Sequence, residues 1–88
     1  MNILAEDQEQ LSRRFSAKDE DRFENIGMTR GANDVPLLDG ALAHLQCRVT
    51  ARYPGGDHTI VVGAVIETAS REGHPLLYYR GGYARLDR

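Results

Sequence analysis

The pair Asp57-His58 is the first feature of the chain that could take part in chemistry, because an imidazole can hold or transfer a proton near neutral pH. The pair lies in the stretch YPGGDHTIVVGAV, residues 53–65, between two glycines and a strongly apolar run. Aspartate and glycine are also common turn residues, so the same stretch predicts a plain turn that begins a strand. The residues alone leave both interpretations open.

Arg80, Gly81, Gly82 and Tyr83 form a second group with chemical potential, in the stretch LLYYRGGYARL. Glycines allow a ligand to approach the backbone closely, and a tyrosine ring can stack on a planar group. The alternative is structural: a bulged edge strand whose tyrosine belongs to the core. Both interpretations stay open for this group as well.

The other reactive side chains indicate no metal site and no hydrolase. His44, His58 and His74 and the single Cys47 lack the spacing of metal ligands. We expect Cys47 to be a core residue rather than a nucleophile. One cysteine forms no internal disulfide, which fits a reducing compartment, and we therefore expect a cytoplasmic protein.

Composition and charge exclude several classes of function. The 88 residues suffice for one small domain, and 41% of them are apolar and 27% charged, as in ordinary globular chains. A formal net charge of −2 gives no electrostatic case for binding nucleic acid or an anionic membrane. The apolar runs are shorter than a membrane span, and the first residues do not have the pattern of a secretory signal.

The spacing of apolar residues predicts the helices and strands that position these groups. Apolar residues recur with a helical period over residues 4–15, with acidic residues first and arginines last, as the helix dipole favours. Residues 16–24 predict a cap and a short second helical turn, and residues 25–36 predict a loop. From residue 43 the period becomes two, which predicts a strand over residues 43–53 with one apolar and one wetter face.

The next predicted strand, residues 59–68, is apolar on both faces, and residues 76–86 predict a third strand interrupted by the glycine pair. We therefore expect a mainly β fold, with one or two short helices at the N-terminus and a three-stranded antiparallel meander. One amphipathic helix covers only one face of the middle strand. The other face requires a partner subunit or a further part of the domain.

Five motifs occur in an order that resembles a known family. NILAEDQEQLSRRFS, DRF, VPLLDGALAHLQCRV, GDHTIVVGAV and PLLYYRGGY look like the C-terminal half of the flavin reductase-like family. Members are short-chain NAD(P)H:flavin oxidoreductases with an FMN-binding split β-barrel, and many are the reductase components of two-component flavin monooxygenases. The resemblance spans residues 2–86. It implies that residues 1–88 form a single partial domain that lacks the N-terminal half of the barrel.

The resemblance also implies cofactors and site residues. FMN, or FAD in its place, is the expected cofactor, and NAD(P)H is the expected substrate. The residues expected to border the FMN are Asn2, Leu4, Ala5, Ser12 and Arg13. Arg13 suits a phosphate by charge and bidentate geometry, although it also suits a solvated helix end.

On the NAD(P)H side the family pattern places His58, Arg80, Gly81, Gly82 and Tyr83, with His58 as the catalytic residue that positions the nicotinamide. We expect a flavin reductase, or a portion of one, that supplies reduced flavin to a partner monooxygenase and forms a homodimer. The chain alone is expected to be inactive. The alternative is a non-catalytic flavin- or nucleotide-binding module, or a structural remnant that associates with itself.

Overall fold

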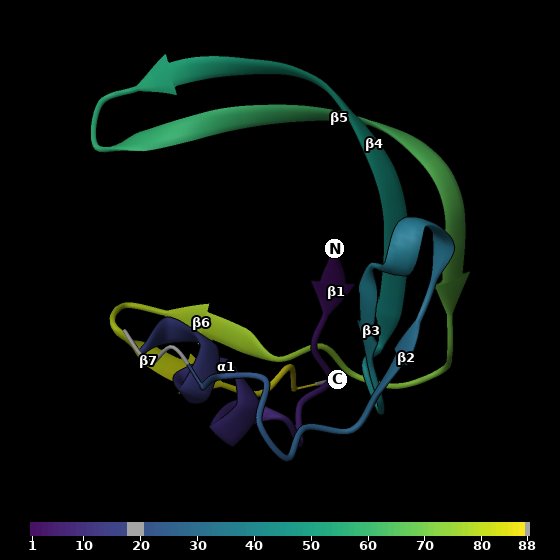
Figure 1. Cartoon of the computed structure of the whole chain (residues 1–88). Helices are drawn as coiled ribbons and strands as arrows, with labels where there is room; N and C mark the ends of the chain where they lie inside the picture. Colours follow the sequence, from purple (N-terminus) through teal and green to yellow (C-terminus); the bar gives the residue numbers. More distant parts are fainter. Residues whose placement is uncertain (18–20, 88) are drawn as a thin grey trace.

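Two long strands dominate the computed structural model, which describes residues 1–17 and 21–87. Strand β4 (Ala43–Gly55) and strand β5 (His58–Ser70) form an antiparallel hairpin that curves through the molecule (Figure 1). Strand β1 (Asn2–Ile3) pairs with the other edge of β4, so the sheet order is β1-β4-β5. The distal part of this hairpin, residues 47–65, is called the arm.

Two smaller antiparallel hairpins complete the strands. Strand β2 (Met28–Arg30) pairs with β3 (Pro36–Leu38) around the short 3-10 helix η1 (Ala32–Asp34). The prediction of a loop over residues 25–36 was therefore wrong for β2 and η1. Pro36 does not prevent the pairing because it is the first residue of its strand and lies at the end of the short ladder, where a missing N–H is tolerated.

The predicted third strand is in fact a separate hairpin. Strand β6 (Leu77–Tyr79) turns back onto β7 (Gly82–Ala84) at Arg80 and Gly81. Both turn residues have positive φ, +53° and +82°, as a two-residue type I′ turn requires. The meander was thus wrong at its third strand, and the glycine pair marks a turn rather than a bulge. The mainly β architecture with one α-helix is confirmed.

Helix α1 (Glu9–Ser16) begins five residues later than its apolar period predicted. The preceding backbone is paired elsewhere: the Leu76 N–H donates to the Leu4 carbonyl at 3.0 Å, and the Glu6 N–H donates to the His74 carbonyl at 2.9 Å. Groups bound across the chain in this way are not available for helical hydrogen bonds. Of the cap and second helical turn predicted for residues 16–24, residues 18–20 lie outside the described residues, and Ser16 is the last residue of α1.

Among the described residues the core is small and contains one buried polar side chain. Ala5, Leu38 and Ala41 are buried, and so is Gln46, which is only 8% exposed although alternation placed it on the wetter face. Its Oε1 accepts a hydrogen bond of 2.7 Å from the Ala32 N–H and so fastens η1 to β4. Gln46 can therefore be buried despite its polar side chain, because its oxygen is hydrogen-bonded.

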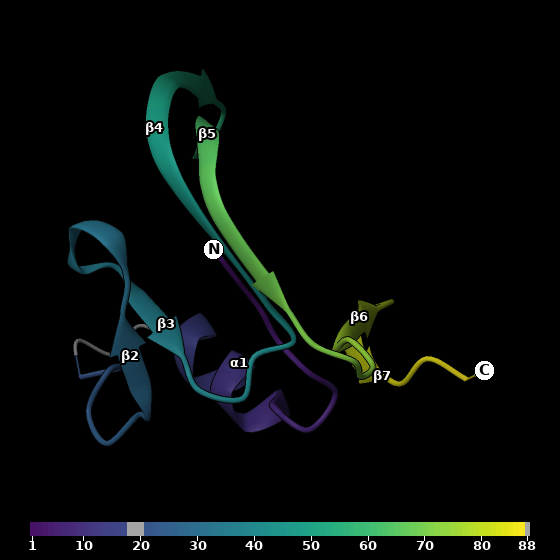
Figure 2. The same ribbon diagram turned by 90° about the vertical axis from the view of Figure 1, so that its right-hand side faces the viewer.

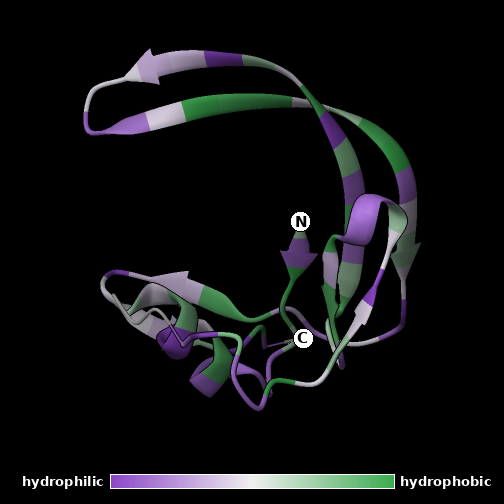
Figure 3. Cartoon of the chain, in the orientation of Figure 1, coloured by the Kyte–Doolittle hydropathy of each residue, from purple (hydrophilic) through white to green (hydrophobic). Residues whose placement is uncertain are grey.

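The arm exposes apolar side chains on both faces. Each is 43–55% exposed: Val49, Tyr53, Ile60, Val61, Val62 and Val65. Figure 3 shows hydrophobic residues along β5 where the ribbon is uncovered. The helix was expected to cover one face of residues 59–68, but in the described chain apolar side chains are exposed on both faces. Cys47 is also exposed, so its assignment to the core was wrong, because nothing described packs on the strand there.

We predict that Gln46→Ala lowers the free energy of unfolding by about 1–3 kcal/mol, because it leaves the Ala32 N–H without its side-chain acceptor. Gln10→Ala is the control, since Gln10 is exposed on α1, and its effect should stay within about 0.5 kcal/mol. Urea denaturation followed by circular dichroism measures both values. Equal effects of the two substitutions would contradict the assigned role of Gln46.

Candidate functional site

Helix α1 contacts the β6–β7 hairpin through two residues predicted to border a flavin. Ser12 Oγ and Tyr83 Oη share a hydrogen bond of 2.8 Å across 71 residues of sequence. The Arg13 guanidinium carbon lies 4.8 Å from the centroid of the Tyr83 ring, within the range of a cation–π contact. Two groups that the sequence predicted separately therefore meet at Tyr83.

An open pocket of about 570 Å³ lies at this junction. Its lining contains hydroxyl groups, one guanidinium and aromatic rings: Ser12, Arg13, Ser16, Ala17, Tyr78, Gly81 and Tyr83. A guanidinium beside hydroxyl donors suits a phosphate, and a tyrosine face suits a planar ring. The donor set thus fits an anionic nucleotide better than an apolar ligand.

Arg13 is held in the pocket wall by a weak second contact. Its guanidinium lies 3.1 Å from Glu9 Oε1, one turn earlier on α1, and both side chains are about half exposed or more. An exposed pair of this kind contributes less than about 1 kcal/mol, so a ligand phosphate can replace the Glu9 carboxylate at small cost. This contact is compatible with the predicted phosphate role of Arg13.

Ser16 and Tyr78 line the pocket and were not among the predicted site residues. Ser16 lies one helical turn after Ser12, and its Oγ donates to the Ser12 carbonyl at 2.9 Å. Tyr78 is the register partner of Tyr83, and their rings meet edge to face at 5.3 Å. The spacing of Ser12 and Ser16 was visible in the sequence, but the partner of Tyr83 required knowledge of the hairpin register.

Asn2, Leu4 and Ala5, which were also predicted to border the flavin, do not line this pocket. Asn2 donates through Nδ2 to the Pro36 carbonyl at 3.3 Å and accepts from the Leu38 N–H at 2.9 Å, which ties β1 to β3. Ala5 is buried and forms a bridge with Pro75. In the described chain these residues hold the strands together, and their flavin contacts stay a prediction.

His58 lies at the tip of the arm, away from the pocket. Its Nδ1 is 2.9 Å from Asp57 Oδ1, and its side chain is 69% exposed. Gly56 has φ +71° at the first loop position, where a type II′ turn takes glycine, so the turn interpretation describes the backbone correctly. Figure 1 shows the tip of the arm and the β6–β7 hairpin at opposite ends of an open, C-shaped curve, and Figure 2 shows the same elements from the side.

Arg80 and Gly82 complete the predicted NAD(P)H side. Arg80 is exposed in the β6–β7 turn beside Gly81, and Gly82 is the first residue of β7. Residues 1–17 and 21–87 contain no cluster of three histidine, cysteine or acidic side chains that could hold a metal ion. No helix within those same ranges has the length and apolar character needed to cross a membrane.

Comparison with known proteins shows the family of this chain. Residues 1–87 match the model of the flavin reductase like domain. An NADH-dependent flavin reductase from a Rhodococcus species is 45% identical over 89 residues, covering 99% of this chain and 48% of the relative. The chain thus spans about half the length of the curated relatives it matches.

Two solved structures have the same fold over nearly the whole chain. A homologue of nitrilotriacetate monooxygenase component B from Mycobacterium thermoresistibile superimposes with a TM-score of 0.90 at 38% identity, over 98% of this chain and 50% of that one. An NADH:FAD oxidoreductase from Streptomyces globisporus, solved with NAD and FAD fragments, gives 0.90 at 33% identity, over 98% and 53%. The fold is that of a partial flavin reductase split barrel.

We predict that Tyr83→Phe lowers the free energy of unfolding by about 0.5–1.5 kcal/mol, because it removes the hydroxyl bound to Ser12 and keeps the ring beneath Arg13. Ser12→Ala should cost a similar amount, and the double variant should cost less than the sum. Tyr79→Phe is the control, since Tyr79 is 70% exposed. Strict additivity in thermal or urea unfolding would show that the two hydroxyls do not interact.

Proposed function

Because the chain belongs to the flavin reductase-like domain family, we propose that it is part of an NAD(P)H-dependent flavin reductase, with FMN as its flavin and FAD as the alternative. The observation that carries the proposal is the joining of Ser12 and Arg13 to Tyr83 around one pocket. The likeness to an NADH-dependent flavin reductase, and to an oxidoreductase solved with NAD and FAD fragments, supports it.

The residues around the pocket bind and orient nucleotide. Arg13 and the hydroxyls of Ser12 and Ser16 hold a phosphate, and Tyr83 offers a ring face to a planar group. Gly81 has no side chain between the turn backbone and the ligand. Bound flavin supplies the hydride chemistry, accepting a hydride from the reduced nicotinamide.

His58 is the proposed positioning group for the nicotinamide. Asp57 Oδ1 lies 2.9 Å from His58 Nδ1, and His58 Nε2 lies over Gly55, where a Cβ on that glycine would be 3.0 Å from it. Hydride transfer depends strongly on how the two rings are placed, so one such contact affects rate more than binding. With Arg80, Gly81, Gly82 and Tyr83 it would form the NAD(P)H side of the site.

We propose further that the chain is the C-terminal part of its domain and that the other half supplies the remaining flavin contacts. Such a protein would supply reduced flavin to a monooxygenase component, a role that the likeness to a monooxygenase component B homologue supports. A cytoplasmic location fits its substrate NAD(P)H and its single cysteine.

A homodimer is part of the same proposal. The exposed apolar arm supports it, since an apolar surface of this extent is typical of an interaction site. The same observation favours the second candidate function, a self-associating structural remnant without turnover. Flavin binding and catalysis distinguish the two candidates.

We predict that the 88-residue chain alone binds FMN more weakly than micromolar and does not oxidise NADH with FMN at a measurable rate, because it has only part of the site. Titration followed by flavin fluorescence, and absorbance of the reduced nicotinamide, measure the two properties. Sub-micromolar binding would show that the flavin site lies within this chain or is rebuilt by two copies. Arg13→Ala should abolish whatever FMN binding is detected.

We predict that His58→Ala lowers kcat/KM for NADH roughly ten- to a hundredfold, while FMN affinity changes little. The measurement uses a chimera in which this chain replaces the matching part of the Rhodococcus NADH-dependent flavin reductase. Asp57→Ala is the control, and its loss should be smaller because it removes only the support of His58. If His58→Ala lowers only the melting temperature, then Asp57 and His58 form a plain turn.

A further inference from the structure

The side-chain amide of Gln8 joins the start of α1 to the turn between β3 and β4. Gln8 directly precedes α1, and its backbone carbonyl accepts the first helical hydrogen bond, from the Ser12 N–H at 3.1 Å. Its side-chain Oε1 accepts from the Ala5 N–H at 2.9 Å, and its Nε2 donates to the Asp39 carbonyl at 2.9 Å. Because one partner is a donor and the other an acceptor, only one orientation of the amide satisfies both.

Arg71 holds the same turn, residues 39–42, from the side of the arm; this turn is called the root turn. Arg71 directly follows β5, and its guanidinium donates to two successive carbonyls, to Gly40 from Nη2 at 2.8 Å and to Ala41 from Nε at 3.3 Å. Together with the bond from Gln8, three successive carbonyls of the root turn accept a side-chain hydrogen bond. The turn is therefore held both by α1 and by the end of β5.

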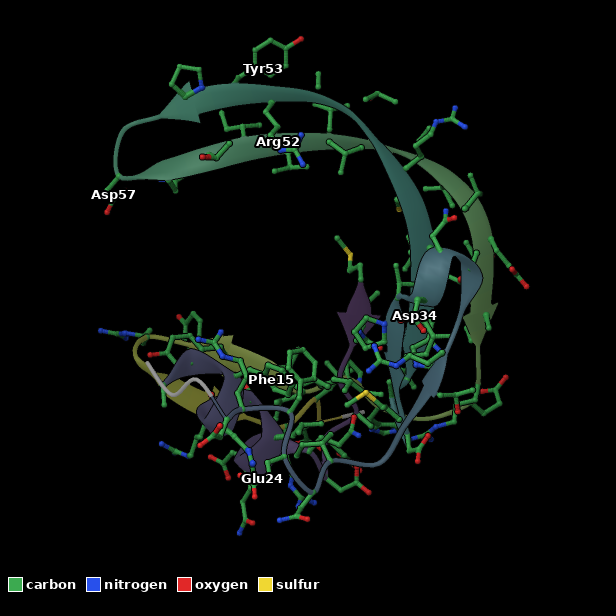
Figure 4. All side chains as sticks on the ribbon, viewed as in Figure 1. Phe15, Glu24, Asp34, Arg52, Tyr53 and Asp57 are labelled. Atoms are coloured by element: carbon green, nitrogen blue, oxygen red, sulfur yellow. The ribbon has the colours of Figure 1, made fainter. Side chains whose placement is uncertain are left out.

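The root turn lies between the two parts of the proposed site. On one side of it, α1 carries Arg13, which lines the pocket. On the other side, β4 and β5 lead to the tip of the arm and to His58. Figure 4 shows Asp57 at this tip, across the open curve of the chain from Phe15 of α1. β4 has 13 residues, so its contour is roughly 40 Å, and a rotation of about 3° at its base moves the tip by about 1–2 Å.

We propose that Gln8 is a positioning residue for flavin reduction: by binding the Asp39 carbonyl it fixes the direction of the arm, and with it His58, relative to α1. The inference rests on the proposed function and adds a residue that does not line the pocket. A misplacement of about 1 Å is enough to slow a reaction between two bound groups. The pocket itself is held by the contacts between α1 and the β6–β7 hairpin, which do not involve the root turn. Loss of the Gln8 contact therefore lowers the rate and leaves flavin binding nearly unchanged.

Gln8→Glu separates the two bonds of the amide. The carboxylate keeps an oxygen for the Ala5 N–H but has no hydrogen to donate to the Asp39 carbonyl. Gln10→Glu is the matched control, because it makes the same change at an exposed position two residues later, on α1. The measurement uses the chimera with the Rhodococcus NADH-dependent flavin reductase, in which Gln8, Asp39 and Arg71 all come from this chain.

Gln8→Glu should lower kcat with NADH roughly three- to thirtyfold and change the FMN dissociation constant less than about twofold, whereas Gln10→Glu should change neither. Gln8→Met has a similar length but neither donor nor acceptor, so it should lower kcat as much as Gln8→Glu and lower the melting temperature more. If Gln8→Met lowers kcat and Gln8→Glu does not, the amide supports only the start of α1, and the positioning role is wrong. A loss of FMN affinity that matches the loss of kcat would also overturn that role, because the pocket itself would then have changed.

Arg71→Lys tests the root turn from the side of the arm. Lysine keeps the positive charge but lacks the planar fork that reaches two carbonyls at once. It should lower kcat roughly two- to tenfold without weakening FMN binding, whereas Arg85→Lys, at an exposed arginine outside the root turn, should have no effect. An unchanged kcat in both Arg71→Lys and Gln8→Glu would show that the root turn does not position the arm. A chimera that reduces no FMN before any substitution would overturn the proposed function and with it the role of Gln8.

Discussion

A two-stranded sheet that is apolar on both faces must be covered on both faces, and the rest of this structure depends on that requirement. The β4–β5 ladder pairs the backbone hydrogen-bonding groups that face each other between the two strands, and it extends the arm to the turn at Asp57. This pairing does not bury the apolar side chains of the arm, which are about half exposed on both faces. Burial of apolar area is the main favourable term in folding. The backbone of the arm is therefore ordered, but its apolar side chains contribute little of the stabilisation that their burial would give.

The region of β1, α1 and the β6–β7 hairpin is held together in a different way. There the contacts are specific and polar: the Ser12–Tyr83 hydrogen bond, the Arg13 guanidinium over the Tyr83 ring, and Asn2 between β1 and β3. Such contacts fix geometry rather than supply large stabilisation, because each replaces hydrogen bonds to water. The pocket at Arg13 and Tyr83 is thus built on directional contacts, while the arm depends on what covers it.

The sequence predicted the long strands well because period-two alternation is a local property, and residues 43–53 and 59–68 lie inside β4 and β5. It failed where long-range pairing decides the structure. Leu4 and Ala5 fit the helical period, yet their backbone pairs with residues 75 and 76, so α1 starts later. The site residues were named from family motifs, but the contact of Ser12 with Tyr83 joins positions that no local pattern relates.

The difference in support between the arm and the β6–β7 hairpin affects how His58 and Tyr83 can act together. His58 is attached to the element with the least support, and Tyr83 to the element with the most specific contacts. The nicotinamide of the proposed site would need both His58 and Tyr83 in fixed positions, because hydride transfer tolerates little misplacement. Packing on the arm by a second copy, or by the rest of the domain, would hold the curve of β4 and β5 and with it the place of His58. Covering the arm and completing the site would then be one event, and a chain that lacked the cover would retain the pocket at Arg13 and Tyr83 without a positioned histidine.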